Sequence, residues 1–137
     1  MKLTLARLAD SLAIKFTGED CSFSRISINT RTLNKGDCFI AIKGDNFDAH
    51  NYIEQAVEKG ACAVIVQRAV DVAVPQLQVP DVRIALGHIA SLWRAGFSLR
   101  VAAITGSCGK TTVKEMTTAI FQSVAGQVLA TEGNLNN

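Results

Sequence analysis

The sequence lacks the features that mark several protein classes. Its apolar stretches are far shorter than the ~20 consecutive residues of a membrane-spanning helix, and Arg7 and Asp10 come too early for a signal peptide. Two prolines and ten glycines in 137 residues argue against disorder or low complexity. Charged residues are scattered and the net charge is only +2, so no nucleic-acid or membrane-surface partner is indicated. We expect a soluble, cytoplasmic globular protein.

A metal-binding cysteine pattern is also missing. No two cysteines form a Cys-x-x-Cys pair, and neither His50 nor His88 stands at a zinc-like spacing from a cysteine. Free cysteine is among the most frequently buried residue types. We therefore expect reduced thiols that mostly pack in the interior, namely Cys21, Cys38, Cys62 and Cys108.

The hydrophobic pattern predicts helices that alternate with strands. Helical periodicity follows Thr4, which can cap the first helix, and follows Asp81, which can cap a later one. Further helices are predicted between residues 50 and 60, ending at Gly60, and from Thr111 to Ser123. Strands are predicted at 23–28, 38–42, 61–66, 77–79 and 101–105, and a further strand is expected to start within 127–131. This alternation indicates an α/β fold.

A boundary is predicted at Pro80-Asp81, which divides the chain into residues 1–80 and 81–137. The part from Val101 onward is barely longer than the ~30 residues of a single βαβ unit, whereas a nucleotide-binding sheet needs several such units. We expect a small N-terminal α/β domain, followed by the beginning of a larger domain.

A glycine-rich loop stands between the predicted strand 101–105 and the helix that follows it. Phosphate groups bind to aligned backbone N–H donors, a mobile cation and a helix N-terminus, and this strand-loop-helix order provides all three. Lys110 can reach the β- and γ-phosphates, and the hydroxyl of Thr111 can coordinate Mg²⁺. The spacing is the short G-x-x-G-K-[ST] form, because Ile104 stands where the longer pattern has glycine. The predicted ATP-binding residues are Gly106, Ser107, Cys108, Gly109, Lys110, Thr111 and Thr112.

Several segments, which together cover essentially the whole chain, resemble the Mur ligase family of cell-wall precursor synthesis. Residues 105–116 resemble the ATP loop of that family, and residues 131–137 resemble its Gly-Asn-x-Asn-Asn segment. Upstream, Asn29–Arg31, Lys35–Gly44 and Phe47–His50 resemble the N-terminal domain of the later-acting members. The resemblance implies that residues 1–80 bind the uridine nucleotide precursor and that residues 81–137 begin a P-loop ATPase domain.

The resemblance also implies a reaction. ATP phosphorylates a substrate carboxylate with the help of Mg²⁺, and an amine attacks the resulting acyl phosphate. Within the family, Val113–Met116 and Gly133–Asn137 are most similar to the member that joins D-alanyl-D-alanine to UDP-N-acetylmuramoyl-tripeptide. The member that adds a single amino acid is the near rival. The resemblance assigns the catalytic roles to Lys110 and Thr111, with Thr111 as the metal ligand, in an enzyme expected to be monomeric.

The precursor-binding residues are carried over from the matching motifs. The family often has Asp-Ser-Arg where this chain has Asn29-Thr30-Arg31, so the hydroxyl and the guanidinium are kept and the carboxylate is not. A hydroxyl, amides and an aromatic ring suit a pyrimidine nucleotide. The predicted substrate-binding residues are Thr30, Arg31, Asn46, Phe47, His50, Asn134, Asn136 and Asn137.

A different class of function stays open at this point. A stand-alone module that holds a uridine nucleotide or another phosphate without catalysis would show the same motifs. The family's further magnesium carboxylate, its modified lysine and its C-terminal domain are expected beyond Asn137. We therefore expect residues 1–137 alone to have no ligase activity.

Overall fold

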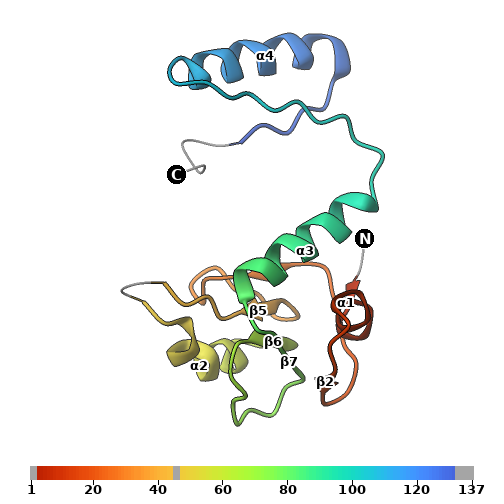
Figure 1. Ribbon diagram of the computed structural model, residues 1–137, viewed down its shortest axis with the longest axis vertical. Helices are drawn as coiled ribbons and strands as arrows, with labels where there is room; N and C mark the ends of the chain where they lie inside the picture. Colours follow the sequence, from red (N-terminus) through yellow and green to blue (C-terminus); the bar gives the residue numbers. More distant parts are fainter. Residues whose placement is uncertain (1–2, 45–46, 132–137) are drawn as a thin grey trace. The chain divides into compact units, whose positions relative to one another are not determined.

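The computed structural model describes residues 3–44 and 47–131. The chain divides into two compact units, Met1–Ser98 (unit 1) and Leu99–Asn137 (unit 2). Both units can be followed in Figure 1, and each is described by itself below.

Unit 1 begins with a short strand that leads directly into a helix. β1 (Leu3–Thr4) pairs antiparallel with β3 (Ser22–Phe23), and α1 (Leu5–Leu12) follows β1 without a break. The Thr4 hydroxyl accepts the backbone N–H of Arg7 at 3.1 Å, which confirms the predicted cap.

The centre of unit 1 is a five-stranded sheet with the order β2-β7-β6-β5-β4. Its strands are β2 (Phe16–Thr17), β4 (Ile26–Ser27), β5 (Cys38–Ile40), β6 (Ala63–Val66) and β7 (Gln76–Gln78). The strands from β4 to β7 run parallel, and β2 pairs antiparallel with β7. The strand predicted at 23–28 is therefore two strands, because β3 pairs with β1 while β4 joins the main sheet.

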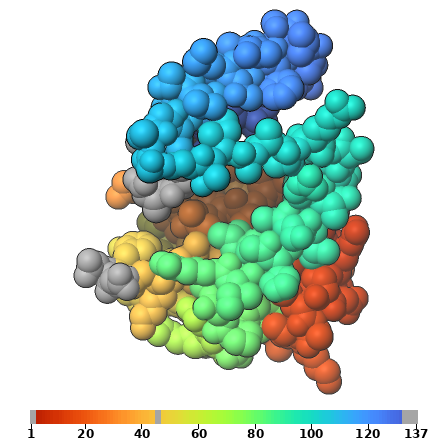
Figure 2. Space-filling model, turned by 45° about the horizontal axis from the view of Figure 1, so that its top comes forward, coloured from red at the N-terminus to blue at the C-terminus, as the bar shows by residue number. Residues whose placement is uncertain are grey.

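Helices cover both faces of this sheet. Alternate residues of β6 point to opposite faces, with Ile65 packed in one apolar cluster and Val64 in the other. The first cluster also contains the buried faces of α1 and α3 (Val82–Ala95), which lie side by side in red and green in Figure 2. The second cluster contains α2 (Ile53–Glu58), which continues from the 3-10 helix η1 (Ala49–Tyr52). Unit 1 thus has three layers, and the predicted α/β class is confirmed.

A glycine ends α2 in the way that the sequence predicted. Gly60 has a φ of +92°, and its N–H donates to the Val57 carbonyl at 2.8 Å. A Cβ at this position would lie 3.0 Å from the Lys35 side chain. Conformation and close approach therefore both favour glycine here.

The predicted boundary after residue 80 differs from the division in the structure, which falls between Ser98 and Leu99. Asp81 does cap α3, since its carboxylate accepts the N–H groups of Arg83 and Ile84 at 2.7 and 3.1 Å. However, α3 packs Val82, Ala85 and Ile89 into the core of unit 1. The cap marks the beginning of a helix and does not mark the end of a domain.

Unit 2 consists mainly of one helix, α4 (Lys110–Ala125). The segments 101–105 and 127–131, predicted as strands, have irregular backbone, so the predicted βαβ unit is present only as a loop and a helix. A parallel strand requires a hydrogen-bonded neighbour, and within the described residues of unit 2 these segments have no ladder partner. All residues of α4 are exposed or half-buried in the described chain.

Within residues 3–44 and 47–131, every helix is too short or too polar to cross a lipid bilayer.

Candidate functional site

The loops that carry the predicted precursor-binding residues leave the same edge of the sheet. β4, β5 and β6 run parallel, so their carboxyl ends share one edge, and ligands in open α/β sheets bind at that edge. Thr30 and Arg31 follow β4, Phe47 and His50 follow β5, and Arg68 follows β6. This group of loops is called the carboxyl edge below.

The loop after β4 is fixed to α2 through Thr30. The Thr30 hydroxyl donates to Gln55 Oε1 at 2.6 Å, and Lys59 Nζ donates to the Thr30 carbonyl at 2.8 Å. Arg31 is exposed, and its backbone N–H donates to Asn29 Oδ1 at 2.9 Å. The Thr30 hydrogen is therefore used within the fold, whereas the Arg31 guanidinium faces solvent.

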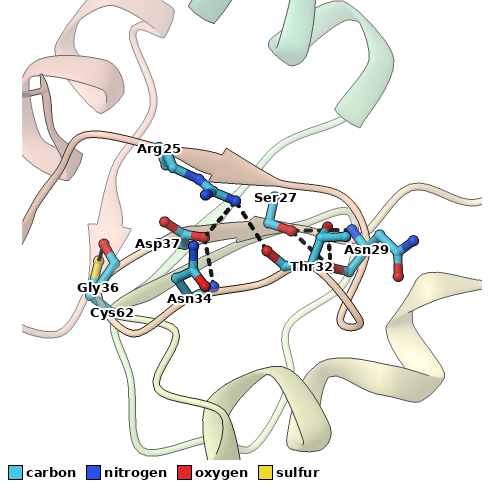
Figure 3. Close-up of polar contacts among 8 residues, drawn as sticks. All are labelled: Arg25, Ser27, Asn29, Thr32, Asn34, Gly36, Asp37 and Cys62. Carbon is cyan, nitrogen blue, oxygen red and sulfur yellow. Dashed lines mark hydrogen bonds and ion pairs between the residues drawn. The ribbon is translucent and has the colours of Figure 1, made fainter.

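The buried carboxylate of Asp37 holds the loop after β4 through the contacts drawn in Figure 3. Asp37 is 4% exposed, and its Oδ2 accepts the backbone N–H of Asn34 at 2.8 Å. The Arg25 guanidinium lies 3.5 Å from the same oxygen and donates to the Thr32 carbonyl at 3.0 Å. This ion pair thus joins the residue before β4 to the residue before β5, at the two ends of the segment that contains β4 and the loop after it.

Two aromatic rings form an exposed stack at the carboxyl edge. Phe47 and Tyr52 have ring centroids 5.3 Å apart and planes inclined by 18°. Their exposed fractions are 55% and 42%, respectively. Exposed aromatic faces are suited to stacking with a planar base.

His50 is buried, and both of its ring nitrogens are occupied. Nε2 accepts the backbone N–H of Gln67 at 3.1 Å, and Nδ1 lies 2.7 Å from Asp48 Oδ1. Because Nε2 accepts, Nδ1 carries the proton and donates to the carboxylate. Asp48 also accepts the His50 backbone N–H at 2.9 Å and lies 3.4 Å from the Arg68 guanidinium. The backbone N–H, and then the ring, hold the pKa of Asp48 below its ordinary value. His50 thus links the loop after β5 to the end of β6.

Four predicted substrate-binding residues lie outside the described residues. They are Asn46, Asn134, Asn136 and Asn137.

The structure adds residues to this edge that the sequence did not single out. Tyr52 stacks on Phe47, Gln55 and Lys59 hold Thr30, and Arg68 adds a cation beside Asp48. The position of Arg68 could have been predicted from the sequence, because Arg68 comes two residues after the apolar run 61–66, where a parallel strand ends. The contacts of Gln55 and Lys59 are tertiary and leave no local pattern.

In unit 2, the phosphate loop leaves the N-terminus of α4 available. Gly109 is the N-cap residue with a φ of +75°, and it provides no side-chain cap for the first turn. The first helical bond runs from the Val113 N–H to the Gly109 carbonyl. The preceding N–H groups are therefore free of intrahelical partners, as an anion site at a helix N-terminus requires.

The side chains of the loop suit phosphate and Mg²⁺. Lys110 is half-buried, and its Nζ donates to the Gly106 carbonyl at 2.7 Å, so the ammonium lies across the loop. Thr111 and Thr112, in the first turn of α4, are exposed, as are Ser107 and Cys108 in the loop. The helix begins at Lys110, one residue before its predicted start. The exposed Thr111 hydroxyl carries an oxygen, the type of atom that Mg²⁺ prefers as a ligand.

The amino-acid sequence was compared with protein-family models and with the sequences of known proteins. The sequence model of the Mur ligase family, catalytic domain, matches residues 22–94, which lie in unit 1. The chain is 45% identical over 137 residues to the UDP-N-acetylmuramoyl-tripeptide–D-alanyl-D-alanine ligase of Escherichia coli, which covers 100% of this chain and 30% of that protein. It is 44% identical over 93 residues to the UDP-N-acetylmuramoyl-L-alanyl-D-glutamate–2,6-diaminopimelate ligase of Aquifex aeolicus, which covers 66% of this chain and 19% of that protein.

Solved structures of Mur ligases are also similar to this chain. MurF from Acinetobacter baumannii superposes with a TM-score of 0.90 at 38% identity, covering 100% of this chain and 31% of that one. MurF from Thermotoga maritima, solved in complex with ADP, superposes with a TM-score of 0.68 at 34% identity, covering 73% of this chain and 23% of that one. The chain spans less than a third of the length of these relatives. Because the family match covers more than half of the chain and the similarity extends over all of it, the chain belongs to the Mur ligase family.

Proposed function

We propose that this chain contributes the first part of an ATP-dependent ligase that joins D-alanyl-D-alanine to UDP-N-acetylmuramoyl-tripeptide in peptidoglycan precursor synthesis. The observation that carries this proposal is the 45% identity to the Escherichia coli ligase, which extends over the carboxyl edge and the phosphate loop alike. The tripeptide carboxylate attacks the γ-phosphorus of ATP, and ADP leaves. The amine of D-alanyl-D-alanine then attacks the acyl phosphate, and inorganic phosphate leaves. The proposed enzyme is monomeric and cytoplasmic.

The proposed ATP site is the loop from Gly106 to Thr112 in unit 2. The free N–H groups of the first turn of α4 would bind phosphate oxygens, and Lys110 would exchange the Gly106 carbonyl for the transferred phosphoryl group. Thr111 would hold Mg²⁺, which neutralises charge on the phosphates. Phosphoryl transfer depends mainly on positioning and charge neutralisation, so a loop without a nucleophile is sufficient. Cys108 lines the loop and has no proposed chemical role.

The proposed precursor site is the carboxyl edge of unit 1. The exposed stack of Phe47 and Tyr52 offers a face for the uracil ring, and Arg31 and Arg68 offer charge for the diphosphate. Thr30 and His50 have their hydrogen-bonding hydrogens engaged within the fold, so we assign them to holding the loops in place. The proposed contacts of Asn46, Asn134, Asn136 and Asn137 complete the substrate set.

Titration of the chain with UDP tests the precursor site. Amide shifts in an NMR spectrum should move for residues 29–31 and 47–52, and Arg68→Ala should weaken binding. Glu58→Ala, on the exposed side of α2, is a control for surface charge. Unmoved amides at the carboxyl edge would refute the assignment.

The amino-acid-adding ligase is the second candidate, and the identity to the Aquifex aeolicus relative favours it over other family members. The two candidates differ in the amine that is joined. Residues 1–137 joined to the remaining domains should form product with D-alanyl-D-alanine and ATP, and a diamino acid should not replace the dipeptide. The isolated 137 residues should turn over no ATP. If the chain belongs instead to a uridine-binding module without catalysis, neither amine should give a product.

A further inference from the structure

Two cysteine side chains that the proposed function does not use lie in contact. Cys21 Sγ donates to Cys62 Sγ at 3.6 Å, and Cys62 Sγ donates to the Gly36 carbonyl at 3.3 Å. Cys21 directly precedes β3, and Cys62 directly precedes β6, so 41 positions of sequence separate them. The fold therefore brings two distant thiols together with their sulfur atoms facing each other.

Both thiols are open to small reagents. Cys21 and Cys62 are partly exposed, and they line a cleft of about 580 Å³ between residues 17–21 and 72–76. The neighbouring Cys38, by contrast, is completely buried in the core of unit 1. A reagent in the cleft meets two of these three thiols.

We propose that Cys21 and Cys62 form a redox-active dithiol, which hydroperoxides oxidise to an intramolecular disulfide. Cys62 loses its proton to water, its sulfur attacks the terminal peroxide oxygen and the O–O bond breaks. The oxygen that leaves takes up a proton from water and departs as an alcohol or water. The Cys21 thiol then attacks the sulfenic sulfur of Cys62, gives up its proton and expels water. The two thiols together lose two protons and two electrons, and the hydroperoxide takes them up to give an alcohol or water and a second water molecule.

The hydrogen bonds assign the order of attack. Burial, followed by the contact with Cys62, raises the pKa of Cys21 to about 12, so Cys21 keeps its proton at neutral pH. Its S–H points at Cys62 and would stabilise a thiolate there. Cys62 is thus the thiol that meets the peroxide, and Cys21 is the resolving thiol.

Disulfide formation would change a defined part of unit 1. A disulfide has sulfur atoms about 2.05 Å apart, so the Cys21 and Cys62 sulfur atoms must approach each other from their present 3.6 Å. The Gly36 carbonyl would lose its donor when Cys62 turns towards Cys21. Residues 34–37 form the turn that holds Asp37 in place, so oxidation acts on the support of the loop after β4.

Mass spectrometry of the peroxide-treated chain tests this proposal. The Cys108→Ser background removes the exposed thiol, which could link two molecules. After treatment with hydrogen peroxide, unfolding and alkylation, that chain should carry one alkyl group and should weigh about 2 Da less before alkylation. Digestion should release a peptide pair joined through Cys21 and Cys62. Cys21→Ser and Cys62→Ser, in the same background, should give no linked peptide.

A second probe measures proximity without oxidation. Phenylarsine oxide contains trivalent arsenic, a soft centre that bridges two neighbouring thiols. The Cys108→Ser chain should bind one equivalent, and either further serine substitution should abolish binding while circular dichroism shows a folded chain. Three alkylated thiols after peroxide, a gain of about 32 Da as sulfinic acid on one cysteine, or a link through Cys38 would each overturn the proposal.

Discussion

At the scale of single residues, the proposed role of Lys110 gives the most direct test. Its ammonium now donates to the Gly106 carbonyl, 2.7 Å away within its own loop. In the proposed ligase, Lys110→Ala should lower kcat by about a hundredfold to a thousandfold, the cost of losing one transition-state electrostatic group. Lys114→Ala is the matched control, because Lys114 lies one turn further along α4 and donates to the Thr131 carbonyl. Steady-state kinetics with saturating ATP measure both, and equal losses would contradict the assignment.

Asp48 predicts a pH dependence of stability. Its pKa is lowered in the folded chain by the His50 backbone N–H and ring, so the unfolded chain binds a proton more readily than the folded one. The stabilisation is therefore complete above the unfolded pKa of about 4 and is lost as the pH falls through the lower folded pKa. Thermal unfolding between pH 6 and about pH 2.5 should show a steeper loss for the original chain than for Asp48→Asn. Parallel curves would show that Asp48 contributes nothing.

At the scale of elements, α3 provides a test of where unit 1 ends. Ile89 is 1% exposed in the unit 1 core, whereas Ile84, on the same helix, is 63% exposed. Ile89→Ala should lower the free energy of unfolding by about 2–5 kcal/mol, because it leaves a cavity in a packed core. Ile84→Ala should change it by less than about 0.5 kcal/mol. Urea denaturation of both variants measures the difference, and similar values would place α3 outside the core.

The helix α4 is expected to be far less protected than the sheet. Met116 and Ile120 on α4 are both 62% exposed, whereas all residues of β6 are buried. Hydrogen bonds in an element with few buried contacts open at low free-energy cost. Amides of α4 should therefore exchange with deuterium at least about a hundredfold faster than those of β6. Comparable protection in native-state exchange would contradict this expectation.

Local patterns predicted some of these elements and missed others. The caps of α1, α2 and α3 depend on Thr4, Gly60 and Asp81, whose effects act over a few residues, so the sequence was enough. The apolar run 101–105 has the composition of a buried strand, but such a strand forms only beside a partner.

The residues of the candidate site also fall into two groups, those that local sequence predicts and those that depend on tertiary contacts. The spacing of the glycines and Lys110 was enough to predict a loop before a helix, because these residues contact each other within their own loop. The hydrogen bond between His50 and Gln67 could not be predicted from the sequence, because it is a tertiary contact between the loop after β5 and the end of β6. Arg68 needed the strand order as well as the sequence, since only a parallel sheet brings its loop to the edge that carries Phe47.

At the scale of the whole molecule, unit 1 is expected to fold without unit 2. Both apolar clusters of buried residues lie within residues 3–89. A chain of residues 1–98 should therefore unfold within about 2 °C of the midpoint of the 137-residue chain, since both clusters stay complete. Differential scanning calorimetry measures both midpoints, and a fall of more than about 5 °C would show that residues 99–137 stabilise the sheet.

The outermost strands of the five-stranded sheet are its shortest. β2 and β4 have two residues each, and they flank β7, β6 and β5, which have three or four. A long exposed edge strand is a template on which another chain can add its own strand, and brief edges remove that template. The sheet is therefore protected against edge-to-edge aggregation, and unit 1 should stay dispersed at the millimolar concentrations that NMR titration requires.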